Sequence, residues 1–123
     1  MNEHDDQHAA APIFRINKFA VPSGSRSEFL GTLTRTHDVM RQHGGFVKAL
    51  FLEQQISPDI VNIVAVIEFA DEAAADRVIA AIAADDRKTG LDRGAMAARL
   101  GITADMGRYR PVGSMSLGAG FPQ

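Results

Sequence analysis

The stretch IVNIVAVIEFADEAAA, residues 60–75, decides the fold of this 123-residue chain. Its β-branched residues follow a turn-forming SPD at 57–59, and this pattern predicts a strand over 60–70. Successive strand residues point to opposite faces. Both faces are mainly apolar: one carries Val61, Ile63, Ala65, Ile67 and Phe69, and the other carries Ile60, Asn62, Val64, Val66 and Glu68. Both faces should therefore be covered in the folded protein.

A helix is predicted to follow this strand. Asp71 can cap its first turn, and the helix should end within 84–90. Its apolar stripe is Ala75, Val78, Ile79 and Ile82. Upstream, residues 46–55 predict a strand that forms a hairpin with 60–70.

The amino-terminal half predicts a strand and an amphipathic helix. Residues 13–21 are the strand, and PSGS at 22–25 is a turn in which Ser25 and Glu28 fit a capping box. The helix should cover 26–42 and end at the glycine pair that follows it. Its apolar stripe is Phe29, Leu30, Leu33 and Met40.

The carboxy-terminal part predicts a short helix over 91–101 and a last strand over 107–117, irregular at Pro111 and Gly113. The order β-α-β-β-α-(α)-β indicates an α+β fold, the ferredoxin-like split βαβ arrangement with an antiparallel sheet. We expect a single domain over 13–118 between tails at 1–12 and 119–123. The sequence assigns no role to the insertion at 87–106.

The strand at 46–55 also predicts two apolar faces. Val47, Ala49 and Phe51 would lie on one side, and Phe46, Leu50 and Leu52 on the other. One layer of helices cannot cover both faces of a sheet. The simplest cover for the second face is the same sheet of another copy, which predicts a face-to-face homodimer. The alternative is that the short extra helix wraps this face.

Composition excludes several classes of function. The chain has no cysteine, which excludes disulfides, thiolate catalysis and cysteine-ligated metals. The net charge of −2 does not favour a nucleic-acid partner. The first twelve residues do not read as a secretory signal, and no apolar run comes near the roughly 20 residues of a membrane span. We expect a cytoplasmic protein with no membrane association. HDDQH at 4–8 has metal-like residues, but an acidic tail lacks the framework of a metal site.

Three segments together resemble the antibiotic biosynthesis monooxygenase (ABM) domains of the dimeric α/β-barrel superfamily. They are RINKFAVPSGSRSEF before the first helix, GGFVKALFLEQ after it, and IVAVIEFADEAAA at the second helix. The resemblance covers about 13–84 and implies a dimeric barrel. The family includes cofactor-independent oxygenases of aromatic molecules, quinol oxygenases and haem-degrading enzymes, so fold and reaction are loosely coupled.

The haem-degrading branch fits this chain poorly. In that branch an asparagine on the first strand, a tryptophan at the end of the third strand and a histidine in the second helical region line the pocket, and Asn17 matches the first. The tryptophan position falls near Ile67, the chain has no tryptophan, and 85–101 contains no histidine. We therefore expect no haem and no other cofactor, and no metal.

Asn17 and His37 are the candidate catalytic residues. The amide of Asn17 could hydrogen-bond a substrate oxygen, or it could be satisfied by its neighbours. Helical spacing turns His37 toward the sheet between Leu33 and Met40, where it could act as a general base or as a packing residue. His43, at the helix end, is expected to interact with the helix dipole.

A set of mostly apolar residues is predicted to bind the substrate: Phe29, Leu33, Met40, Phe51, Ile67, Met96 and Tyr109. Ordinary core packing is the alternative for most of them. Tyr109, between two arginines, could present its hydroxyl to an anion or pack at an interface.

The leading hypothesis is a cofactor-independent monooxygenase of an aromatic or quinol molecule, which must make its substrate anionic in a dry pocket. The alternatives are a non-catalytic dimeric ligand-binding or stress-related domain, and an isomerase or cyclase that needs a base but no oxygen.

Overall fold

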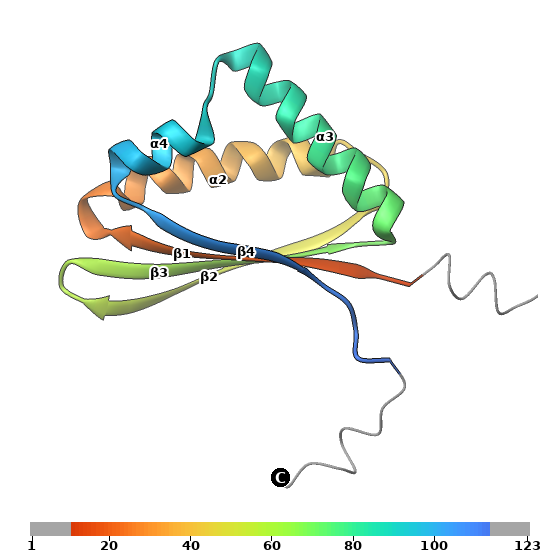
Figure 1. Ribbon diagram of the computed structural model, residues 1–123, viewed down its shortest axis with the longest axis horizontal. Coiled ribbons are helices and arrows are strands. Elements are labelled where there is room, and N and C mark those ends of the chain that lie inside the picture. Colours follow the sequence, from red (N-terminus) through yellow and green to blue (C-terminus); the bar gives the residue numbers. More distant parts are fainter. Residues whose placement is uncertain (1–10, 114–123) are drawn as a thin grey trace, which may run out of the picture.

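The computed structural model describes residues 11–113, which form a four-stranded antiparallel sheet with helices on one face (Figure 1). The strand order is β2-β3-β1-β4. The strands are β1 (Ile13–Pro22), β2 (Phe46–Ser57), β3 (Ile60–Phe69) and β4 (Thr103–Tyr109). The α+β fold with ferredoxin-like topology is confirmed.

Three α-helices and a short turn of 3-10 helix connect the strands. They are η1 (Ser23–Ser25), α2 (Arg26–Arg41), α3 (Glu72–Thr89) and α4 (Arg93–Leu100). Asp71 caps α3 as predicted, because its carboxylate accepts a hydrogen bond from the Ala74 N–H at 2.8 Å. Gly101 ends α4 at φ 74°, in the left-handed region that glycine adopts without strain. None of these helices is long and apolar enough to span a membrane.

Three local predictions were wrong. The Ser25 hydroxyl does not cap α2; it donates to the Leu100 carbonyl at 2.7 Å and so ties the start of α2 to the end of α4. The last strand begins and ends earlier than 107–117, and residues 114–117 lie outside the described part. A bulge after Phe46 shifts the register, so Phe46 lies on the helix side, edge-on to Phe69.

The helix-covered face of the sheet buries two apolar clusters. The first packs the amino end of α3 on one end of the sheet: Ile13, Met40, Ala65, Ile67, Phe69, Ala74, Ala75 and Val78. The second packs the amino end of α2 and α4 on the other end: Val21, Phe29, Leu33, Val61, Ile63, Met96, Leu100 and Ile102. We call the boundary between them the seam.

The other face of the sheet carries no helix in the described residues, and we call it the open face (Figure 1). Leu50 and Leu52 of β2 lie there and are 51% and 53% exposed. Val64 and Val66 of β3 are half-buried beside them. The short extra helix α4 packs on α2 through Met96 and Thr32, so it does not wrap this face.

Candidate functional site

One row of residues crosses the sheet at the seam on the helix side. The strand register places Phe51, Ala65, Asn17 and Met106 opposite one another on β2, β3, β1 and β4. Ala65 has the smallest side chain of the four. The larger side chains of Phe51 and Asn17 therefore stand on either side of this small residue in the middle of the sheet.

Asn17 is the polar member of this row. It faces the helices, as the alternation of β1 predicts, and its side-chain Oδ1 is buried without a hydrogen-bond partner. A buried acceptor without a partner costs about 1–3 kcal/mol of stability. Among the described residues Asn17 is therefore not simply a satisfied packing amide, and a ligand hydroxyl or N–H would satisfy its Oδ1.

His37 projects from α2 toward the sheet, as its helical spacing predicts. Its ring packs edge-on against Phe51 at a centroid distance of 5.6 Å and against Phe46 at 5.7 Å. Phe51 and Asn17 lie on strands two apart, so about 10 Å of sheet separates them. His37 thus packs on the β2 end of this row, and Asn17 lies in the same row two strands away.

Arg15 lies on the same face two residues before Asn17, opposite Ile67 on β3 and Arg108 on β4. The side chain is half-buried, and within residues 11–113 it has neither an ion pair nor a hydrogen bond. Burial, and after it the charge of Arg108, lowers the pKa of the Arg15 guanidinium. Among the described residues, the helix side of β1 therefore combines an unsatisfied amide oxygen with a positive charge that no carboxylate neutralises.

The predicted substrate-binding residues are divided by the fold. Phe51 is in the row with Asn17, and Tyr109 lies on the open face, away from it. The others are buried in the two clusters: Phe29, Leu33 and Met96 in one, and Met40 and Ile67 in the other. Leu33 and Met40 border the seam on either side of His37, so of this set Phe51, Leu33 and Met40 are nearest the row.

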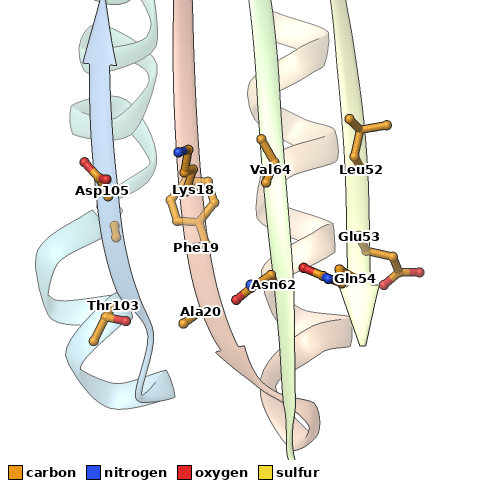
Figure 2. A pocket seen from close by; sticks show the side chains of 11 residues that line it. Lys18, Phe19, Ala20, Leu52, Glu53, Gln54, Asn62, Val64, Thr103 and Asp105 are labelled. Atoms are coloured by element: carbon orange, nitrogen blue, oxygen red, sulfur yellow. The ribbon is translucent and has the colours of Figure 1, made fainter. Parts of the chain in front are cut away.

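A hollow of about 360 Å³ lies in the open face at the end of the sheet nearest the β2–β3 turn (Figure 2). Lys18 and Asp105 line one side, and Leu52 and Val64 the other. A second hollow lies between α2 and α4. Neither opens onto Asn17 or His37. The described residues hold no cluster of three or more metal-ligating side chains.

Sequence reasoning overlooked Arg15 as a site residue. The signal was present, because strand alternation places residue 15 on the same face as residue 17. The absence of a partner for its guanidinium depends on where α3 places its carboxylates. This information comes only from the tertiary structure.

Comparison with solved structures finds the same fold. SnoaB, a cofactor-independent oxygenase from Streptomyces nogalater, is 22% identical, with a TM-score of 0.61 over 87% of this chain and 99% of its own. A protein from Shewanella loihica PV-4, provisionally described as a monooxygenase, is 21% identical, with a TM-score of 0.58 over 83% and 95% of the two chains.

A third similar structure comes from Bacillus cereus and is provisionally described as an antibiotic biosynthesis monooxygenase. It is 16% identical, with a TM-score of 0.55 over 86% of this chain and 98% of its own. No protein-family model and no curated protein sequence matches the chain. The resemblance to the ABM domains is thus confirmed at the level of the fold.

Proposed function

We propose that this protein is a cofactor-independent monooxygenase of a small phenol or quinol. The observation that carries the proposal is the buried Oδ1 of Asn17, which has no partner and lies in the middle of the helix-covered face. A substrate hydroxyl would donate a hydrogen bond to this oxygen. The similarity in fold to SnoaB, a cofactor-independent oxygenase, supports the same reaction class.

The proposed chemistry needs only the substrate and dioxygen. A base, for which His37 is the candidate, takes the hydroxyl proton, and the resulting anion transfers one electron to dioxygen. The two radicals join in a carbon–oxygen bond, and the peroxide then loses water as its O–O bond breaks. One oxygen atom stays as a ring carbonyl and the other leaves as water, and the substrate supplies all four electrons.

We place the proposed route to Asn17 at the edge of the sheet formed by β4. Met106, its neighbour in the row, is 54% exposed although it faces the helix side, and Ala104 beside it is exposed too. In Figure 1, α3 starts against the sheet and rises away from it, while α4 lies over its other end. A flat aromatic ring could thus enter beside Met106, whose flexible thioether side chain adapts to such a ligand.

We also propose that two copies pack through their open faces. The exposed Leu50 and Leu52, with the half-buried Val64 and Val66, form an apolar surface that water would otherwise cover. This packing would enclose the hollow of Figure 2 between the two sheets. The helix-side row would remain accessible in each copy.

Oxygen uptake tests the proposed reaction. The purified chain is supplied with a panel of quinols and anthrones in an oxygen-electrode cell, alongside Asn17→Ala and His37→Gln. We expect uptake by the wild type, and a fall of about a hundredfold or more in each variant, in line with the loss of a general base or of the hydrogen bond that positions the substrate hydroxyl. Asn62→Ala, an asparagine on the open face, and His43→Gln, at the exposed end of α2, are matched controls.

The alternative is a non-catalytic ligand-binding domain. It is favoured by the fact that neither hollow opens onto Asn17 or His37. Phenols that bind to the wild type and not to Asn17→Ala, without consumption of oxygen for any substrate, would establish this alternative. Equal uptake by the wild type and both variants would refute the roles given to the two residues.

A further inference from the structure

We propose that Arg15 binds a carboxylate of the substrate, so that the ligand class of the seam is a hydroxylated aromatic carboxylate. This inference rests on the proposed function because it concerns the same site. It adds a specificity-determining residue and the charge of the molecule that the site accepts.

The first argument is the position of Arg15. It lies on the helix side of β1, on the same face as Asn17, in the row that crosses Ile67 and Arg108. Residues two apart on a strand are about 7 Å apart, which is close to the span of one aromatic ring with a substituent at each end. A ring whose hydroxyl meets Asn17 would therefore present a second substituent to Arg15.

The second argument is charge. Arg108 Nη2 donates to Asp76 Oδ1 at 2.7 Å, and Arg110 pairs with Glu72 at 2.9 Å, so α3 neutralises the arginine of β4 and the arginine just after it. Arg15 has no such carboxylate in the described residues. Two carboxylates, Asp76 and Glu72, thus face three arginines, and one positive charge is left uncompensated among the described residues.

The third argument is burial. The half-buried guanidinium of Arg15 has lost part of its hydration, and the nearby charge of Arg108 adds repulsion, which together lower its pKa. A guanidinium in this state gains most from a planar anion that accepts two parallel hydrogen bonds, and a carboxylate has this geometry. A neutral second substituent would leave the charge uncompensated.

Calorimetric titration with a matched ligand pair tests the inference. The probes are 4-hydroxybenzoate and its methyl ester, which share the ring and the hydroxyl and differ in charge. We expect the wild type to bind the acid about tenfold or more tightly than the ester. Arg15→Met, which keeps an apolar side chain of similar length, should bind both alike, and Arg15→Lys should keep part of the preference.

Arg110→Gln is the control, since this arginine lies near the same edge of the sheet and is already paired. Circular dichroism and urea unfolding verify that each variant is folded. Equal binding of acid and ester by the wild type, a preference that survives in Arg15→Met, or no binding of either probe would each overturn the inference.

The result is separable from that of the oxygen-uptake experiment. A preference for the acid that depends on Arg15, with no oxygen uptake for any substrate, would refute the oxygenase and leave the carboxylate site. Uptake with neutral quinols and no preference for the acid would leave the oxygenase and refute the carboxylate site.

Discussion

Each face of the sheet carries side chains that its surroundings disfavour: polar groups under the helices on one face, and exposed apolar groups on the other. On the helix side, β3 buries every residue to 6% exposure or less, yet β1 places Arg15 and Asn17 there. On the open face, Leu50 and Leu52 are apolar and half exposed. Polar groups that are covered indicate a ligand, and apolar groups that are uncovered indicate a protein partner.

The largest effect is expected on stability, where a buried side chain of the helix side is removed. Phe69→Ala removes a side chain that is 1% exposed and packs against Phe46, and it should lower the free energy of unfolding by about 3–5 kcal/mol. Val112→Ala, at a site that is 62% exposed, should change it by less than about 0.5 kcal/mol. Urea unfolding measures both, and similar losses in the two variants would contradict the burial described.

The open face should respond to charge through association. Val64→Glu places a carboxylate where the proposed partner sheet would pack, which should weaken the dimer by about a hundredfold or more in Kd while the fold persists. Sedimentation velocity across a concentration series measures this. Thr34→Glu, on the exposed side of α2, is the control. A wild type that sediments as a single chain at every concentration would rule out the dimer.

In the middle of the helix side, a substitution that raises stability should abolish function. Asn17→Leu removes the unsatisfied Oδ1 and puts an apolar side chain with the same branched shape in its place, so the free energy of unfolding should rise by about 1 kcal/mol. Oxygen uptake should be lost in the same variant. Chemical denaturation provides the measurement. A loss of stability of similar size would mean that the amide is satisfied within the fold.

The smallest effect is expected at the ion pair between Arg26 and Glu53, which ties α2 to β2 at the exposed edge. The hydrogen bond from Arg26 lowers the pKa of the Glu53 carboxyl, with partial desolvation acting against it. The pair therefore stabilises the fold above the unfolded-state pKa of about 4.3, and the effect is lost as pH falls through the folded-state value.

Glu53→Gln should lower the melting temperature slightly at pH 7, less so in high salt, and the difference from the wild type should narrow in acid. Thermal unfolding at pH 7 and in acid compares the two. A difference that persists unchanged at low pH would show that the ion pair is not its source.

Much of the fold could be predicted from the sequence because local signals and burial agreed. The period-two pattern of β3 gave the strand and both of its faces, and Asp71 gave the start of α3. The local predictions were wrong where contacts between distant segments override the local sequence signal. Ser25 bonds to Leu100, 75 residues away, instead of to its own helix, and the bulge after Phe46 moves that ring to the other face.

The candidate site was partly predictable for a similar reason. Alternation and helical spacing alone predict that Asn17 and His37 face the space between sheet and helices. One strand lies between Asn17 and Phe51, the residue on which His37 packs, because of the strand order β2-β3-β1-β4, which no local pattern encodes. The assignment of Phe29, Leu33 and Met96 to one cluster, and of Met40 and Ile67 to another, likewise depends on how α2 crosses the sheet.

The sequence by itself determined the order of the elements, the class of fold and the faces of β1 and β3, because these follow from the periodicity of apolar side chains. The tertiary structure alone decided which polar groups lack partners. Arg108 and Arg110 meet carboxylates of α3, whereas Arg15 and the Oδ1 of Asn17 meet none in the described chain. Pairing depends on distances between segments that lie far apart in sequence, and packing sets those distances.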